Sequence, residues 1–136
     1  MDAPTAASNV EIARRFIAAV ESGPTRGELA SFMSDDVEQH ELPNRLFPEG
    51  VRRGLAALLA SSEKGAKVLR SQSYDIVNVF GAGSHVAIEM KWKGVLAVPL
   101  GKLVPGDTLT GQFAFFLEIE NGKIRRMRNY DCYDPF

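Results

Sequence analysis

Polar side chains that could transfer a proton lie at two places in the sequence. Near the C-terminus they are Gln112, Asn129 and Asp131, and in the first half of the chain they are His40 and Glu41. A carboxylate or an imidazole acts as a general acid or base when it lies beside the proton that must move. An amide or imidazole can donate a hydrogen bond to the oxyanion that develops when a proton leaves a carbon next to a carbonyl. These residue types could move a proton or hold a developing negative charge, and they do not by themselves name a reaction.

A predicted β-hairpin positions the C-terminal group. Asn121-Gly122 lies between two runs rich in β-forming residues, and this dipeptide is typical of a two-residue type I′ turn, because both central positions need positive φ. Pairing Glu120 with Lys123 sets the register. Counting outward from the turn gives the further pairs Ile119 with Ile124, Glu118 with Arg125, Phe116 with Met127, Ala114 with Asn129, and Gln112 with Asp131. An extra residue in either strand would exchange the two faces beyond it.

Side chains alternate between the two faces of this hairpin. One face then carries apolar and cationic side chains: Phe113, Phe115, Leu117, Ile119, Ile124, Arg126, Arg128 and Tyr130. The other is apolar in its middle and polar at its far end: Glu118, Arg125, Phe116, Met127, Ala114, Asn129, Gln112, Asp131 and Tyr133. Such a face is typical of a pocket wall, so we expect Gln112, Asn129 and Asp131 to point together into a cavity. Apolar walls there would raise the pKa of Asp131 above about 3.9.

Composition bounds the class of protein. The 136 residues, 45% of them hydrophobic, predict one globular domain spanning 1–136. A formal net charge of −1 gives no electrostatic footprint for nucleic acid or an anionic membrane. Cys132 is the lone cysteine, so an intrachain disulfide is excluded. We expect its side chain on the face of the hairpin that Asp131 does not occupy, with no base beside it. The N-terminus lacks a signal-peptide pattern and no run is long enough to span a membrane, so we expect a cytoplasmic protein.

Three helices are predicted before a long run of strands. Ser8 and Glu11 form one capping-box pattern, and Thr25 and Glu28 form a second. The first helix is expected to end at Gly23-Pro24, the second at Ser34 to Asp36, and the third near Gly65. Beyond them, the expected strands are Val68 to Phe80, Val86 to Val98, and the two arms of the hairpin. Helices followed by antiparallel strands predict an α+β fold, in which a curved sheet wraps around the helices.

The order of these elements carries a resemblance, together with the segment DDVEQHELP and the ending RNYDCYDPF. The chain resembles the nuclear-transport-factor-2-like superfamily, and within it the SnoaL-like group, which is related to polyketide cyclases, ketosteroid isomerases and limonene-epoxide hydrolases. The resemblance covers Ser8 to Phe136. It implies a cone-shaped α+β barrel with three N-terminal helices packed in a mostly antiparallel sheet, an internal pocket, and commonly a homodimer through the outer sheet face. Because the superfamily hosts enzymes and binding modules, the fold alone assigns no activity.

The resemblance also assigns candidate catalytic roles. Glu41 stands nearest the acidic residue before proline that is the general base of the isomerase branch, although Leu42 intervenes here. His40 matches a histidine often found beside it. Asn129 replaces the water-activating aspartate of an Arg-Asp-Tyr signature in the epoxide-hydrolase branch, which argues against that reaction. Asp131 resembles the terminal-strand acid/base of the cyclases. The candidate catalytic residues are therefore Asp131, His40 and Glu41.

Each candidate also has a purely structural interpretation. His40 could be an ordinary structural histidine, Glu41 could be exposed to solvent, and Asp131 could anchor the C-terminal tail by hydrogen bonds. Gln112 and Asn129 could form a local network. The expected substrate-binding residues are Gln112, Asn129, Trp92, Tyr74, Phe116 and Met127, and of these Trp92 suits the core equally well.

Two classes of function stay open. In an isomerase, cyclase or dehydratase, Asp131 would move the proton while His40, Tyr74 or Gln112 stabilised the oxyanion. In a binding or assembly module, the same groups would only orient a small hydrophobic ligand. We expect no metal, because the two histidines, His40 and His85, lack ligand-like spacing to other donors. We expect no cofactor, because the G-x-G at Gly81 to Gly83 lacks the following helix of a phosphate-binding loop. We expect a homodimer, because three helices can cover only one face of the sheet.

Overall fold

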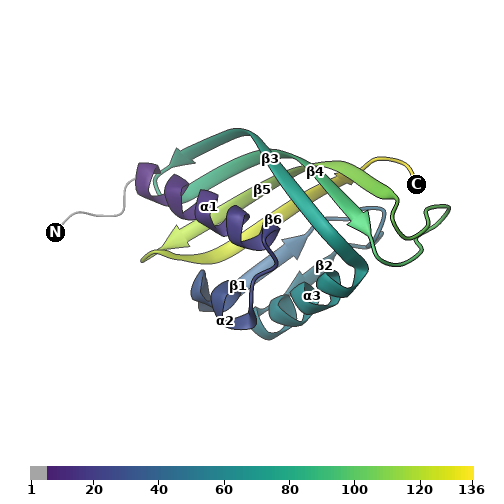
Figure 1. The fold of residues 1–136 in the computed structure, drawn as a ribbon. Coiled ribbons are helices and arrows are strands. Elements are labelled where there is room, and N and C mark those ends of the chain that lie inside the picture. Colours follow the sequence, from purple (N-terminus) through teal and green to yellow (C-terminus); the bar gives the residue numbers. More distant parts are fainter. Residues whose placement is uncertain (1–5) are drawn as a thin grey trace.

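Residues 6–136 are described by the computed structural model, in which three helices accompany one six-stranded sheet (Figure 1). In chain order the elements are α1 (Ala6–Glu21), α2 (Arg26–Ser31), β1 (Met33–Glu41), β2 (Val51–Arg53), α3 (Leu55–Val68), β3 (Leu69–Ala82), β4 (His85–Leu96), β5 (Thr108–Glu120) and β6 (Lys123–Tyr133). The strand order is β2-β1-β6-β5-β4-β3. Neighbouring strands are antiparallel except β1 and β6, which are parallel. The predicted α+β cone of helices in a mostly antiparallel sheet is confirmed, with a sheet that curves but does not close.

All three helices pack on the same side of this sheet. α1 crosses β3 and β4, and α3 packs on β1 (Figure 1). Phe16 and Ile17 of α1 are buried with Ile88 and Met90 of β4 in one continuous core. Burying a large apolar side chain contributes about 1.5–3 kcal/mol, so this inner face supplies most of the stability. The opposite face of the sheet, called the outer face below, carries none of the three helices of residues 6–136.

The helix boundaries differ from the prediction in three places. α1 already includes Ala6, so the expected capping box at Ser8 is wrong, and Asn9 instead donates from its side chain to the Gly83 carbonyl at 3.0 Å. The second capping box is confirmed, because the Glu28 amide donates to Thr25 Oγ1 and the Thr25 amide donates to Glu28 Oε1. The expected ends of the other two helices are also wrong.

Tertiary pairing explains both of those errors. α2 ends at Ser31, because the chain from Met33 onward joins the sheet as β1 beside β6. α3 continues past Gly65 to Val68 before it turns directly into β3. A single glycine in a helix costs only about 1 kcal/mol relative to alanine, which the packing of α3 on the sheet offsets.

The hairpin prediction is correct at the turn and wrong beyond it. Asn121 and Gly122 both have positive φ, of 52° and 76°, as a type I′ turn requires. Glu120 pairs with Lys123 and Ile119 with Ile124 as expected. A bulge follows, because Glu118 pairs with Arg126 and leaves Arg125 as the extra residue. Every later pair is shifted by one position.

The bulge changes which face each arm of the hairpin presents. Asp131 lies opposite Phe113, and Asn129 lies opposite Phe115. The expected neighbour of Asp131, Gln112, instead pairs with Cys132. Phe116 pairs with Arg128, and its side chain is 38% exposed on the outer face. The prediction that Gln112 and Phe116 share a cavity wall with Asp131 is therefore wrong, since Gln112 and Phe116 lie on the outer face.

Candidate functional site

A network of buried polar side chains occupies the inner face where β1, β2 and β6 meet. Arg53 Nη1 donates to Glu41 Oε1 at 2.9 Å and to Gln39 Oε1 at 3.0 Å. Gln39 Nε2 donates to Asn129 Oδ1 at 3.0 Å, and Asn44 Nδ2 donates to Glu41 Oε2 at 2.9 Å. Parallel pairing of β1 with β6 places Glu41 level with Asn129 and so brings these groups together.

The ion pair in this network is almost fully desolvated. The side chains of Arg53 and Glu41 are only 8% and 10% exposed. Such a pair is stable only when hydrogen bonds satisfy its remaining donors and acceptors, and the bonds from Arg53 to Gln39 and from Asn44 to Glu41 do so. The expectation that Glu41 could be exposed to solvent is wrong. The extra residue, Leu42, continues the strand pairing, because its backbone N–H donates a hydrogen bond to the Asn129 carbonyl. Glu41 therefore stays on the inner face.

Asp131 lies beside this network without belonging to it. Its Oδ1 atom is buried and has no hydrogen-bond partner among the residues that the structure describes, although the residue as a whole is partly exposed. Burial, and then the negative charge of Glu41, raise the pKa of Asp131 to about 7, while Arg53 acts in the opposite direction. The predicted rise in its pKa is confirmed. A carboxyl group that titrates near neutral pH can both take up and return a proton.

Two phenols lie within electrostatic reach of Asp131. Tyr133 is on the same face of β6, and Tyr74 reaches the site from β3. Burial raises the pKa of both hydroxyls well above the ordinary value, and the charge of Asp131 raises it further. Both hydroxyls therefore stay protonated at neutral pH and can donate a hydrogen bond.

Aromatic rings form the apolar part of the site. Trp92 stacks on Phe113 with ring centroids 5.1 Å apart, and Tyr133 packs edge-on against both rings. Gly94 makes room for the indole, because a Cβ there would lie 2.6 Å from the Trp92 ring. Trp92 Nε1 donates to Gln72 Oε1 at 3.0 Å, which fixes the orientation of the ring. Trp92 and Phe113 are almost fully buried, so these rings belong to the hydrophobic core next to Asp131.

The structure brings together some predicted site residues and separates others. Asp131, Glu41, Asn129, Tyr74, Trp92 and Met127 all lie on the inner face. His40 is on the opposite side of β1 from Glu41, next to Arg128 of β6. Cys132 is exposed on the outer face, as expected. In residues 6–136, no three His, Cys, Asp or Glu side chains gather as a metal site requires.

Three members of the network were missed from sequence. Gln39 had a readable signal, because Val37, Gln39 and Glu41 alternate onto one face of a strand. Arg53 had none, because β2 is only three residues long and follows an irregular loop. Asn44 likewise gave no signal within that loop.

A curved, unclosed six-stranded sheet with three helices on one face defines the class of α+β cone folds among residues 6–136. The chain belongs to the SnoaL-like domain family, whose model matches residues 13–127. Among curated protein sequences, none matches this chain. None of the helices in residues 6–136 is long and apolar enough to cross a membrane.

Solved structures share the fold over most of their length. One is a provisionally assigned polyketide cyclase from Xanthomonas campestris pv. campestris, with 23% identity over 90% of this chain and 88% of that chain and a TM-score of 0.75. Another, from Xanthomonas campestris, is a protein of unknown function with a cystatin-like fold, with 26% identity, coverage of 90% and 89%, and a TM-score of 0.69. A third, from Catenulispora acidiphila, has a ketosteroid isomerase-like fold and was solved with trimethylamine, with 19% identity, coverage of 88% and 84%, and a TM-score of 0.70.

Proposed function

We propose that this SnoaL-like protein binds a small hydrophobic carbonyl compound against the inner face and moves a proton on it, as an isomerase, cyclase or dehydratase. The observation that carries the proposal is Asp131, whose buried Oδ1 has no hydrogen-bond partner in the described residues and whose pKa is raised to about 7. The naming of structural neighbours as polyketide cyclases, provisional though it is, agrees with this chemistry.

The proposed reaction begins with proton abstraction. The Asp131 carboxylate takes a proton from the carbon next to the carbonyl, and the C–H electron pair moves into the enolate. Tyr133 and Tyr74, which stay protonated, donate hydrogen bonds to the resulting oxyanion. Return of the proton from Asp131 to another carbon of the enolate gives an isomer. Attack of the enolate carbon on a second carbonyl carbon closes a ring, the C=O π electrons move to the oxygen, and the alkoxide takes the proton back from Asp131.

The roles of the other two predicted catalytic residues change in this proposal. Both carboxylate oxygens of Glu41 accept hydrogen bonds from Arg53 and Asn44, so we assign Glu41 to positioning and to raising the pKa of Asp131. His40 lies on the outer face, so the oxyanion role passes to the phenols.

Deuterium exchange tests the proposal without knowledge of the product. We expect the protein to accelerate α-hydrogen exchange of 2-tetralone in D₂O, followed by NMR, because this step needs only proton abstraction. Asp131→Asn should reduce the acceleration by at least about 100-fold. Asp75→Asn, which removes an exposed carboxyl from β3, is the matched control and should leave the rate unchanged. Equal rates for wild type and Asp131→Asn would reject the proposal.

The second candidate function is binding without chemistry. It is favoured by the hydrogen bonds that join Gln39, Asn129 and Arg53, because these groups already satisfy one another as a structural network would. In that case 2-tetralone or a related ketone would perturb inner-face resonances, while no protein variant would change its exchange rate.

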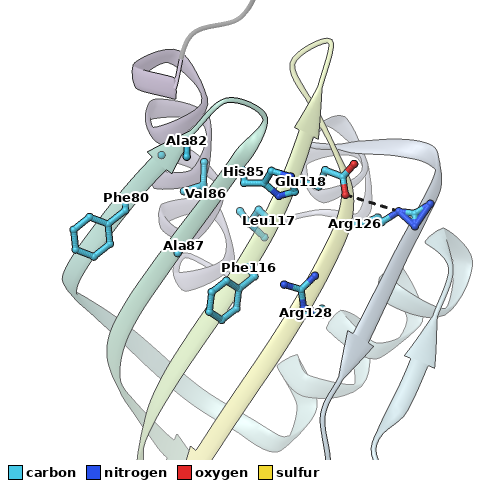
Figure 2. A pocket seen from close by; sticks show the side chains of 11 residues that line it. Phe80, Ala82, His85, Val86, Ala87, Phe116, Leu117, Glu118, Arg126 and Arg128 are labelled. Carbon is cyan, nitrogen blue, oxygen red and sulfur yellow. Dashed lines mark ion pairs between the residues drawn. The ribbon is translucent and has the colours of Figure 1, made fainter.

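We also propose that the protein is a cytoplasmic homodimer. The outer face exposes Phe80 and Tyr130 by 66% and 41%, beside the partly exposed Phe116. Phe80, Ala87 and Phe116 lie side by side on neighbouring strands (Figure 2), and a symmetric copy would bury such a patch. The exposed free thiol of Cys132 suits a reducing compartment. Sedimentation that gave only a monomer at micromolar concentration would contradict the dimer.

A further inference from the structure

Two hollows meet on the outer face of the sheet. The smaller, of about 160 Å³, lies over β3 to β6 and is shown in Figure 2. The larger, of about 570 Å³, lies over the β2, β1 and β6 end and is lined by Glu38, Gln39, His40, Arg52, Arg53, Gly54, Arg126, Met127 and Arg128. Arg126 and Arg128 line both. The larger hollow is unusual in composition, because arginines supply four of its nine lining residues.

The strand register concentrates three basic side chains in one row of this hollow. Arg52 of β2 pairs with His40 of β1, and His40 pairs with Arg128 of β6. Neighbouring strands lie about 4.8 Å apart, so one small ligand can reach all three. The Arg128 guanidinium also lies over the Phe116 ring, 5.4 Å from its centroid, which restricts its movement (Figure 2).

Ion pairs within residues 6–136 neutralise some of the arginines that line the larger hollow, but not all of them. Arg126 forms two long ion pairs, with 3.9 Å from its Nη1 to Glu38 Oε2 and 3.9 Å from its Nε to Glu118 Oε2. Arg53 forms an ion pair with Glu41. Among residues 6–136, no carboxylate forms an ion pair with Arg52 or Arg128. The hollow therefore carries two uncompensated guanidinium groups, together with the hydrogen-bonding capacity of His40.

We propose that the larger outer hollow is a binding site for a small phosphate monoester, held by Arg52 and Arg128 with His40 between them. A phosphate monoester carries about −1.5 to −2 charges near neutral pH, which matches the two free guanidiniums. Arginine presents donors in a planar fork that fits phosphate oxygens. The volume exceeds that of the phosphate group, so the organic part has room in the same hollow. This site lies on the opposite face from Asp131 and does not depend on the proton-transfer proposal.

An NMR titration with phenyl phosphate tests this site at constant ionic strength. We expect amide shifts to cluster at Arg52, His40 and Arg128, with inorganic phosphate binding at the same residues and benzoate, a monoanion, binding at least about fivefold more weakly. Arg52→Gln and Arg128→Gln should each weaken phenyl phosphate binding by roughly tenfold or more, since each removes a charge-assisted hydrogen bond.

The matched control is Arg125→Gln, which removes the same charge from β6 where Arg125 already pairs with Glu120 and Asp36. It should change the affinity less than about twofold. Shifts spread over all basic residues, or equal losses from Arg125→Gln and Arg128→Gln, would reduce the effect to nonspecific charge and overturn the proposal. So would a change in dimerisation by Arg52→Gln and Arg128→Gln without any phosphate binding, because the row would then be an interface between copies of this chain.

Discussion

The two faces of β6 carry opposite chemistry within a few residues. Met127 and Asn129 point inward and are buried, whereas Arg126 and Arg128 point outward and are exposed. Inside, burial raises the pKa of Asp131 to about 7. Outside, solvent screens the charges, and the ion pairs of Arg126 are long. The same strand thus supplies a candidate acid/base on one face and a basic surface on the other, and the bulge at Arg125 decides which residue serves which face.

The largest effect should come from a deletion that exchanges the two faces. Removing Arg128 would turn Asn129, Asp131 and Tyr133 outward and bring Tyr130 and Cys132 inward. Tyr133 alone would lose its contacts with the Trp92 and Phe113 rings. We expect this loss to cost as much stability as replacing a large core side chain by a small one. We expect destabilisation above about 4 kcal/mol or failure to fold, measured by urea denaturation.

Deletion of Arg125 is the matched control for that experiment. It removes the same charge and the extra residue of the bulge, so every later side chain of β6 keeps its face. Only the exposed surface pairs with Glu120 and Asp36 are lost, so we expect a much smaller destabilisation than from the deletion of Arg128. Equal destabilisation by the two deletions would show that the faces of β6 do not depend on the bulge.

The next largest effect should come from the buried ion pair on the inner face. Arg53→Ala leaves the Glu41 charge buried and unpaired, and we expect a loss of about 3–5 kcal/mol in thermal or chemical denaturation. Arg26→Ala is the contrasting variant, because the pair of Arg26 with Glu63 is more than half exposed and should contribute at most about 1 kcal/mol. A similar loss in both variants would contradict the difference in burial.

The pH dependence of stability should report the inner face directly. Unfolded Asp131 titrates near its ordinary value of 3.8, whereas the folded protein holds the proton up to a pKa of about 7. Between these values the folded state binds more protons than the unfolded state, so this contribution to stability is present at about pH 4, decreases as the pH rises, and is lost above about pH 7.

Asp131→Asn should remove that dependence. We expect the substitution to leave the free energy of unfolding nearly unchanged at about pH 4 and to raise it by roughly 2 kcal/mol at about pH 8. Each pKa unit corresponds to about 1.4 kcal/mol, and we expect less than the whole rise in pKa would give, because the side chain is partly exposed. Melts at several pH values provide the measurement, with Asp75→Asn as the exposed control. Destabilisation at pH 8 would mean that Asp131 is ionised and held by donors.

Sequence predicted the parts of this arrangement that local chemistry decides. The Asn121-Gly122 turn and the alternation of the strands depend on residues within a few positions of one another, and both are confirmed. The position of the one-residue bulge could not be predicted, because it depends on distant partners: it places Met127 in the core and Asn129 within hydrogen-bond distance of Gln39. The burial of Glu41 likewise depends on its ion pair with Arg53. Arg53 lies beyond an irregular loop, in a strand of three residues that the sequence pattern does not indicate.

The smallest predicted effect compares two amides, Asn129 and Gln112, that the sequence placed on the same face of the hairpin. Asn129 is 5% exposed, and its Oδ1 accepts a hydrogen bond from Gln39 Nε2. Asn129→Ala therefore leaves the buried Gln39 amide without this acceptor. We expect a loss of about 1–3 kcal/mol, measured by urea denaturation. Gln112 lies on the outer face beside Cys132 and is exposed, so Gln112→Ala should change stability by less than about 0.5 kcal/mol. The two variants remove the same functional group from neighbouring strands, and their difference measures burial alone. If Gln112→Ala cost as much as Asn129→Ala, the amides would share one environment, and the hairpin would have the regular register that its sequence first suggests.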